Sequence, residues 1–265
     1  MNKKISILMT VYNGANFLKE SIESILNQTF KDFELIIVND YSTDNTIQII
    51  KEFNDKRIRL FNLNSRFGRT KALNYGLKRC SSELIAIQDA DDISNNTRLE
   101  KLLGQILKDK NLGLVFSNFE IINNKNEIIK KPKIDFSKNK KIFISKLKYI
   151  NLIAHSSVIF KRNVKKKNFF YDENYEYAQD YQMILYYLKN SQIHQVNENL
   201  VKIRHHSDNM TNQKKLFKKR VLENINLLDF SESQFINTYK EKIFIKFFKF
   251  KNYIKLTIYE LKNLI

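Results

Sequence analysis

The sequence predicts an α/β fold with a mainly parallel central sheet, helices on both faces of that sheet, and a helical C-terminal tail. Two observations carry this prediction. Apolar runs alternate with amphipathic segments over the first 118 residues, which is the pattern of strands joined by crossover helices. The apolar runs are also continuous rather than interrupted at every second residue, as expected of strands that are covered on both faces.

The elements of this first half can be placed from their periodicity. Continuous apolar runs predict strands at Ile5–Thr10, Phe33–Asn39, Glu83–Gln88 and Leu112–Phe119, and the more polar segment Arg57–Leu63 is also predicted as a strand. Apolar residues three and four positions apart predict helices at Phe17–Gln28, Thr46–Phe53, Thr70–Cys80 and Arg98–Asp109.

The alternation ends after Asn118. Residues 119–150 are polar and lysine-rich and contain the only proline, Pro132. The elements predicted beyond them are a strand at Ser156–Arg162, a helix at Tyr181–Asn190, and two short strands at Gln192–Val196 and Leu200–His206. We therefore expect one domain over residues 1–212, divided into halves at 118/119, and a helical tail over 213–265.

The composition indicates an anionic partner. Lysine and arginine outnumber aspartate and glutamate by 46 to 28 in 265 residues, which gives a net charge of +18. The first 100 residues are close to balanced, whereas the stretch from Lys214 onward is lysine-rich. The codon usage of an AT-rich genome is an alternative explanation for the excess. The single cysteine, Cys80, excludes an internal disulfide, and no apolar stretch approaches the roughly 20 residues of a membrane span. We expect a cytoplasmic protein.

The tail has the pattern of a basic amphipathic helix. Apolar residues recur at helical spacing at Ile243, Phe247, Phe250, Ile254, Ile258 and Leu261, and lysines are offset from them at Lys242, Lys246 and Lys249. Such a helix can lie on an anionic membrane surface. Its apolar face could equally pack on the domain or on a partner protein.

Polar residues follow three of the predicted strands. They are the segments Thr10–Gly14 and Asp40–Asp44 and the cluster of Asp89, Asp91 and Asp92. Ligands of parallel sheets bind beyond the carboxyl ends of the strands, and clustered carboxylates can hold Mn²⁺ or Mg²⁺, which in turn holds phosphate. The alternative for the aspartate cluster is a helix cap or a solvated loop. The chain has neither a GxGxxG nor a GxxxxGK[ST] phosphate loop.

The segment "SILMTVYNGANFLKESIESILNQTFKDFELIIVNDYSTDNT", followed later by "DADD", resembles the nucleotide-sugar domain of family 2 glycosyltransferases. The resemblance covers residues 4–118 and implies a GT-A fold. The family pattern "DDGS" reads Asn39-Asp40-Tyr41-Ser42 here, so a tyrosine replaces the glycine and leaves the geometry of this loop open.

The resemblance assigns the donor site. It implies that Asp40 accepts a hydrogen bond from the uracil imide and that Thr10 and Tyr12 line the same pocket. Arg69 would reach the nucleotide, with Arg66 as the alternative.

The aspartate cluster would bind the rest of the donor. Asp89 would lie on the ribose side, Asp91 would ligate Mn²⁺ or Mg²⁺ at the diphosphate, and Asp92 would be the third member of the site.

Three later segments resemble the acceptor half of the family. "AQDYQ" places Asp180 as the catalytic base, with a helix N-cap as the alternative role. "AHSSVIFKR" places His155 at the acceptor or the diphosphate, unless it makes only a structural hydrogen bond. "LVKIRHH" places His206 as a further metal ligand and Arg204 as a phosphate contact.

The resemblance implies a metal-dependent inverting glycosyltransferase. We expect it to move a sugar from a UDP-sugar, with GlcNAc favoured over galactose and glucose, to a hydroxyl of a growing bacterial surface glycan such as lipooligosaccharide or capsule. The enzyme would work at the inner face of the cytoplasmic membrane. Two other classes fit parts of the sequence: a haloacid-dehalogenase-type phosphatase that uses Asp89 and Asp91, and a basic nucleic-acid-binding protein. No nucleic-acid-binding motif supports the latter, so we expect no nucleic acid as partner.

Overall fold

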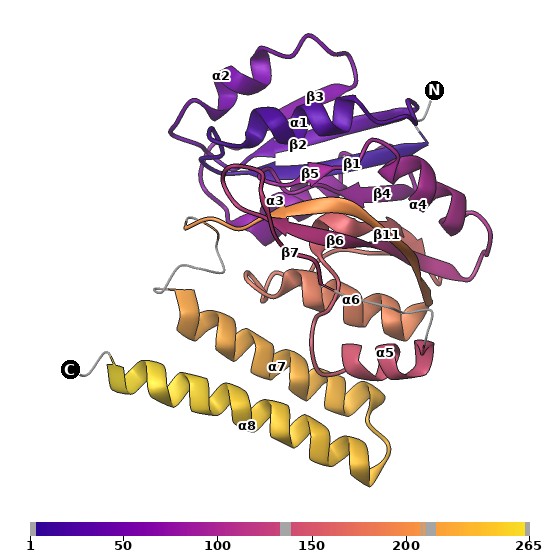
Figure 1. The fold of residues 1–265 in the computed structure, drawn as a ribbon, viewed down its shortest axis with the longest axis vertical. Helices are drawn as coiled ribbons and strands as arrows, with labels where there is room; N and C mark the ends of the chain where they lie inside the picture. The colour runs from indigo at the N-terminus through magenta and orange to yellow at the C-terminus, as the bar shows by residue number, and fades with distance from the viewer. Residues whose placement is uncertain (1–3, 133–138, 208, 210–215, 263–265) are drawn as a thin grey trace.

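The computed structural model describes residues 4–132, 139–207, 209 and 216–262. Within these residues the main sheet has nine strands in the order β3-β2-β1-β4-β8-β6-β11-β5, with β7 paired to β6 (Figure 1). Neighbouring strands from β3 to β4 are parallel, and β6 is parallel to β11. The strands β8 and β5 run antiparallel to their neighbours. The predicted mainly parallel α/β sheet is confirmed.

The elements follow the predicted order in the first half of the chain. Its strands are β1 Ile5–Val11, β2 Phe33–Asn39, β3 Ile58–Asn62, β4 Leu84–Ile87, β5 Ile93–Ser94 and β6 Leu112–Ile122. Its helices are α1 Leu18–Leu26, α2 Thr46–Lys51, α3 Arg69–Leu77 and α4 Arg98–Ile106.

The second half contributes shorter strands and the remaining helices. Its strands are β7 Ile128–Lys130, β8 Val158–Lys161, β9 Asn163–Val164, β10 Lys167–Asn168 and β11 Gln192–Arg204. Its helices are α5 Lys140–Leu147, the 3₁₀ turn His155–Ser157, α6 Gln179–Asn190, α7 Phe217–Phe235 and α8 Tyr239–Lys262.

Two hydrophobic cores cover the two faces of the sheet, which is why the strands read as continuous apolar runs. On one face, Ile7 of β1 packs with Ile22 of α1 and Leu102 of α4. On the other face, Leu8 packs with Leu73 of α3, and α5 and α6 extend the same core. Successive residues of β1 thus serve opposite layers.

The structure differs from the prediction where the pattern was weak. The two short strands predicted between residues 192 and 206 form one strand, β11, whose register against β6 shifts on either side of Asn199. The polar segment 119–150 contains the end of β6, β7 and α5. The two-residue strand β5 is too short to leave a period-2 pattern.

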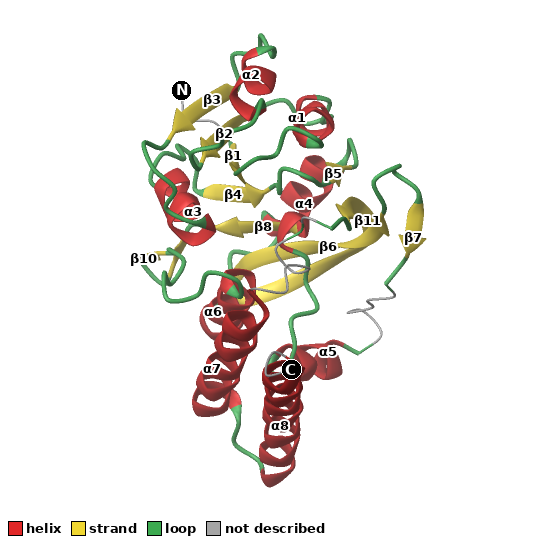
Figure 2. Cartoon of the chain, turned by 90° about the vertical axis from the view of Figure 1, so that its left-hand side faces the viewer, coloured by secondary structure: helices red, strands yellow, loops and turns green. Residues whose placement is uncertain are grey.

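Helices α7 and α8 form an antiparallel pair beyond α5 and α6, away from the β1–β4 part of the sheet (Figures 1 and 2). The buried Ile245 packs with Tyr149, Leu228 and Ile236. Lys249 forms ion pairs with Asp229 and Glu232 of α7.

The predicted apolar stripe of the tail lies outside this contact. Its members Ile243, Phe247, Phe250, Ile254 and Ile258 are between 42% and 63% exposed. The side chain of Leu261 and the predicted 212/213 boundary fall outside the described residues. In the part of the chain that the structure describes, no helix is long and apolar enough to cross a membrane.

Candidate active site

The carboxyl ends of β4, β1 and β2 lie side by side, because these three strands are parallel neighbours. Tyr12 and Asp40 directly follow β1 and β2, and Asp89 lies two residues beyond β4. These side chains therefore meet at one edge of the sheet, as predicted.

Asp40 holds the loop that leads into α3. It is buried, and its carboxylate accepts hydrogen bonds from the backbone amides of Phe67 (2.8 Å) and Gly68 (2.9 Å). Burial raises the pKa of the Asp40 carboxyl, because the two amide bonds and the Arg66 charge offset the desolvation only in part. Each carboxylate oxygen has a second lone pair that a ligand can use.

Tyr12 and Arg66 form a cation–π pair beside Asp40. The Arg66 guanidinium lies 3.8 Å from the centroid of the Tyr12 ring, and Tyr12 is 39% exposed. Thr10 is partly buried near the end of β1, opposite Val38 of β2. The structure therefore places Arg66, rather than Arg69, beside Tyr12 and Asp40.

Tyr41 occupies a backbone conformation that glycine favours. Its φ is +64°, in the left-handed region that costs a side-chain-bearing residue roughly 1–2 kcal/mol. Asn13 also has a positive φ and joins the two loops, since it donates its backbone N–H to Ser42 Oγ and accepts from the Thr43 amide. The loop therefore keeps a glycine-like conformation although tyrosine replaces the glycine of the family pattern.

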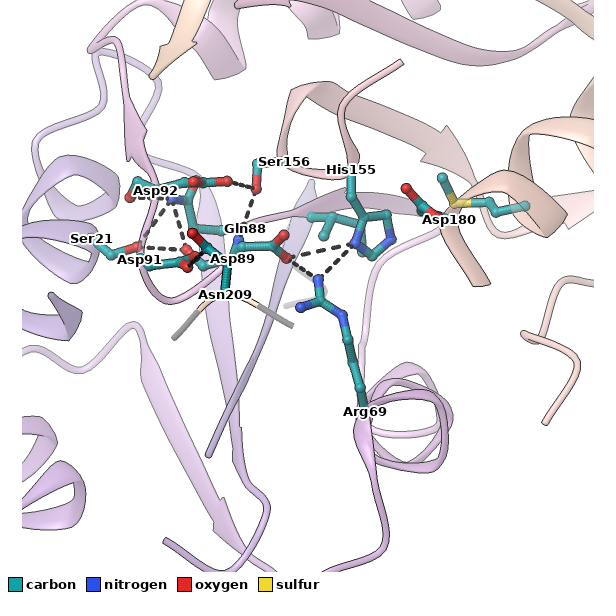
Figure 3. A network of polar contacts seen from close by, with 12 residues as sticks. Ser21, Arg69, Gln88, Asp89, Asp91, Asp92, His155, Ser156, Asp180 and Asn209 are labelled. Carbon is teal, nitrogen blue, oxygen red and sulfur yellow. Dashed lines mark hydrogen bonds and ion pairs between the residues drawn. The ribbon is translucent and has the colours of Figure 1, made fainter. Parts of the chain in front are cut away.

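Arg69, Asp89 and His155 form a charged cluster (Figure 3). The Arg69 Nη2 donates to Asp89 Oδ1 at 2.5 Å and lies 3.2 Å from His155 Nδ1. Burial alone would lower the pKa of Arg69, but the charges of Asp89, Asp91 and Asp180 outweigh it and raise that pKa. Burial would likewise raise the pKa of Asp89, but Arg69 and His155 hold it well below its usual range.

The two ring nitrogens of His155 face different neighbours. Nδ1 lies 3.2 Å from Arg69 Nη2 and 3.6 Å from Asp89 Oδ1. Nε2 lies 2.9 Å from the Tyr171 hydroxyl, which donates to Met183 Sδ at 3.4 Å. His155 is thus buried as a link between Arg69 and the core.

Asp92 is a structural residue of the β4–β5 loop. Its Oδ2 accepts from Ser156 Oγ at 2.5 Å, its Oδ1 accepts from the Arg204 backbone N–H at 2.9 Å, and the residue is 3% exposed. Burial, together with the nearby charges of Asp91 and Asp89, raises its pKa well above the usual value. The predicted contact of Asp92 with the donor is not supported by this geometry.

Asp91 faces the segment after β11. Its Oδ2 accepts from Asn209 Nδ2 at 3.0 Å and lies 3.0 Å from His206 Nε2. The Asp91 side chain is 29% exposed, and the His206 ring packs against Phe17 with ring centroids 4.8 Å apart. The two predicted metal ligands, Asp91 and His206, are therefore adjacent. No group of three or more His, Cys, Asp or Glu side chains with metal-site geometry occurs within the described ranges.

Arg204 does not point toward the predicted phosphate position. Its guanidinium binds Glu20 Oε2 at 2.7 Å and the backbone carbonyls of Asp91 and Asn123 at 3.0 Å each, and it lies over the Phe17 ring. Its side chain is 1% exposed. Arg204 therefore positions the backbone of Asp91, and the geometry does not support the predicted phosphate contact.

Asp180 lies across His155 from Asp89 in Figure 3. It is the second residue of α6, whose N-cap is Ala178, so the alternative N-cap role is wrong. Its Oδ2 accepts from Asn151 Nδ2 at 2.8 Å, and its Oδ1 accepts from the Tyr181 amide. Burial raises its pKa, although the charges of His155 and Arg69 partly offset this effect.

Sequence reasoning missed the residues that hold these groups. Gln88 and the fully buried Arg98 support the aspartate loop, since Arg98 donates to Gln88 Oε1 and to the Ile87 carbonyl. Burial lowers the pKa of Arg98 to about 10. Asn151 and Ser156 were missed as well, because short polar residues in loops leave no periodic signal.

The fold and the grouping of carboxylates at the strand ends define a nucleotide-sugar-transferase type of α/β protein. Residues 6–169 match the model of the family described as Glycosyl transferase family 2. The chain belongs to this family, which confirms the resemblance found in its motifs.

Two curated relatives illustrate the match. An uncharacterized glycosyltransferase of Rickettsia typhi is 32% identical over 78% of this chain and 66% of its own length. The Escherichia coli UDP-Glc:α-D-GlcNAc-diphosphoundecaprenol β-1,3-glucosyltransferase WfgD is 34% identical over 73% of each chain. This chain thus spans about two thirds of the length of the first relative.

Two solved structures share the fold. Staphylococcus aureus TarS in complex with UDP-GlcNAc superposes with a TM-score of 0.68 at 18% identity, covering 90% of this chain and 69% of TarS. The mannosyltransferase PcManGT of Pyrobaculum calidifontis, in complex with GDP-Man and Mn²⁺, superposes with a TM-score of 0.69 at 16% identity, covering 98% of this chain and 74% of that one. The predicted GT-A fold is confirmed.

Proposed function

We propose that this chain is a metal-dependent inverting glycosyltransferase that moves a hexose from a UDP-sugar to a hydroxyl of a lipid-linked bacterial glycan. One observation carries the proposal. Arg69 forms an ion pair with Asp89 at 2.5 Å, and the charges of Asp91 and Asp180 also act on it, so the proposed ribose, metal and base residues all interact with one partly buried cation. Such an arrangement suits a substrate whose diphosphate and acceptor hydroxyl meet at this point.

Asp180 is the proposed base. In a single displacement the acceptor hydroxyl attacks the anomeric carbon as the diphosphate leaves, and the base accepts the hydroxyl proton. The raised pKa of Asp180 supports this role, because a carboxylate in a desolvated site is a stronger proton acceptor. Asn151 holds one carboxylate oxygen and thereby fixes the direction of the other.

Asp91 and His206 are the proposed metal ligands. The Asp91 carboxylate is the type of ligand that suits Mn²⁺ or Mg²⁺, and the His206 Nε2, 3.0 Å from it, would add a nitrogen ligand. A site with one carboxylate and one imidazole leaves coordination positions for diphosphate oxygens and water, which is how such ions bind at phosphate-transfer sites. A bound divalent cation would neutralise the charge that develops on the departing diphosphate.

The proposed pocket for the uracil ring is formed by Asp40, Tyr12, Thr10 and Arg66. Asp89 would lie toward the ribose. WfgD is named as a glucosyltransferase that uses UDP-Glc, so UDP-glucose is the first donor to test. UDP-GlcNAc, which the sequence motifs favour, is the second, and UDP-galactose is the third. The same name suggests a sugar linked to diphosphoundecaprenol as the class of acceptor.

The exposed stripe of α8 supports attachment to the inner face of an anionic membrane. Phe247, Phe250 and Ile254 are exposed, and Lys246 and Lys251 are exposed beside them. Apolar area together with basic charge is the two-part signal for such binding. A lipid-linked acceptor would be found at the same surface.

The test is a donor panel. UDP release is measured from UDP-glucose, UDP-GlcNAc and UDP-galactose with Mn²⁺ and a diphosphoundecaprenol-linked acceptor. One donor should be turned over, and Asp180→Asn should abolish its turnover while UDP binding is retained. If the chain binds UDP but releases UDP from none of the three donors, that result would contradict the proposed donor class.

A second measurement separates the function classes. UDP with Mn²⁺ should raise the unfolding temperature of the full chain, and Asp91→Ala should remove this shift. If the chain were a phosphatase or a nucleic-acid-binding protein, UDP with Mn²⁺ should not shift its unfolding temperature. The absence of this shift in the unmodified chain would therefore contradict the assignment as a glycosyltransferase.

A further inference from the structure

The segment from Tyr175 to Ala178 leads directly into Asp180, and it is held from two sides. On the donor side, Thr70 Oγ1 donates to the Tyr175 carbonyl at 2.6 Å. With its amide oriented to satisfy both neighbours, Gln179 accepts from Arg69 Nε and donates to the Glu176 carbonyl, each at 2.9 Å. The donor half therefore fixes one side of this segment, which we call the base loop.

The other side is fixed by a single carboxylate from α7. Glu223 Oε1 accepts from the Glu176 amide at 3.0 Å, and its Oε2 accepts from the amides of Tyr177 (2.7 Å) and Ala178 (3.0 Å). Glu223 is 4% exposed. Three successive amides that converge on one buried carboxylate form a strong anion-binding arrangement.

These contacts lie outside the family match. That match ends at residue 169, so Asp180, the base loop and α7 all come after it. Lys219 of α7 adds an ion pair with Glu176 and lies 5.2 Å from the Tyr177 ring centroid. Helix α7 therefore has specific polar contacts with the segment that carries the base.

We propose that Glu223 is a positioning residue of the transfer reaction, and that α7 is thereby a part of the active site. The proposal rests on the proposed role of Asp180 as base. Glu223 sets the backbone at the start of α6, and this backbone sets where the Asp180 carboxylate lies. A displacement of about 1 Å at a reacting group can reduce turnover about 100-fold.

The role predicts a specific kinetic signature. Glu223→Gln retains one acceptor oxygen but presents an N–H to the amides, and it should lower kcat about 10-fold. Glu223→Ala should lower kcat about 100-fold. Neither change should alter the KM for the donor or the Mn²⁺-dependent stabilisation by UDP, because Glu223 touches none of the proposed donor residues.

Glu232→Gln is the matched control. Glu232 is on the same helix but binds Lys249 of α8, so the same substitution there should leave kcat unchanged. The amides of Glu176, Tyr177 and Ala178 should exchange their hydrogens faster in Glu223→Ala and at the original rate in the control. This measurement remains informative if the alanine variant is less stable.

The outcomes separate the two proposals. Wild-type kcat in Glu223→Gln and Glu223→Ala would overturn the positioning role. Parallel losses in kcat, donor affinity and unfolding temperature would also overturn it, because they indicate general destabilisation. Turnover by Asp180→Asn at the rate of the unmodified chain would instead contradict the proposed base, and would do so whatever the Glu223 variants show.

Discussion

The edge of the sheet that carries the aspartates and the outer face of α8 differ in how their side chains are satisfied. At the edge, Asp89, Asp92 and Asp180 each accept hydrogen bonds from residues distant in the chain. On α8, Phe247 and Phe250 are about 60% exposed. The side chains of the first region are held in place by one another, whereas the second leaves an apolar surface uncovered.

The largest effect should come from the edge. Asp180→Asn should lower transfer about 1000-fold, because it removes the proton acceptor.

In the unmodified enzyme, the transfer rate should fall on the acid side at a pH above the usual range of an aspartate, since burial raises the pKa of Asp180 beside Arg69, His155 and Asp89. Rate–pH profiles measure this. An acid limb in the ordinary aspartate range would contradict the assignment.

The next effect tests α8. Phe247→Ser combined with Phe250→Ser should weaken binding to anionic vesicles by about 100-fold or more, given about 1.5–3 kcal/mol for each buried Phe side chain. Vesicle sedimentation measures it. These substitutions are better than deleting residues 236–265, because Ile236 and Ile245 pack in the core beside Tyr149.

The matched control for α8 replaces two equally exposed apolar residues elsewhere. Leu107→Ser combined with Ile129→Ser, both 55% exposed, should leave vesicle binding unchanged. Equal losses in the two double variants would show that the stripe on α8 has no special role.

A third change tests whether the edge is stabilised as a unit. Arg69→Ala should lower the free energy of unfolding by about 2 kcal/mol, because it leaves the Asp89 carboxylate without its main partner. Urea unfolding measures this. Arg69→Lys keeps the charge and should cost less, so equal losses for both variants would argue that packing, and not charge, is responsible.

Asp180→Asn should also make the chain more stable at pH 7. Because burial raises the folded-state pKa of Asp180, its contribution to stability is fully present at low pH and is lost as the pH rises through that pKa. The amide avoids this loss. The gain in unfolding temperature should therefore be present at pH 7 and shrink toward pH 4. A gain of equal size at both pH values would point to another cause.

The smallest effect concerns the loop at Tyr41. Tyr41→Gly should stabilise the chain by about 1 kcal/mol or less, because it removes left-handed strain but adds backbone freedom to the unfolded state. Thermal unfolding measures it. A loss of UDP affinity in this variant would show that the exposed Tyr41 ring contacts the donor.

The sequence was sufficient for β1, β2, β4 and β6, because each of these strands is a continuous apolar run next to an amphipathic helix. It was also sufficient to bring Asp40, Asp89 and Asp91 to one edge, since parallel neighbours place their carboxyl ends together. It did not reveal that Asp92 is buried, because adjacent aspartates differ only in where the loop turns. Nor could it reveal Glu223, which lies on a helix far along the chain and has no motif.

The two hydrogen bonds of the Asp92 carboxylate should affect the thermodynamics of ligand binding. It joins the β4–β5 loop to Ser156 and to the end of β11, so three segments lose their conformational freedom when the chain folds and not when the donor arrives. The entropy of ordering these segments is then absent from the binding free energy. Calorimetry of UDP should accordingly show a small heat-capacity change, close to that of the buried ligand surface alone.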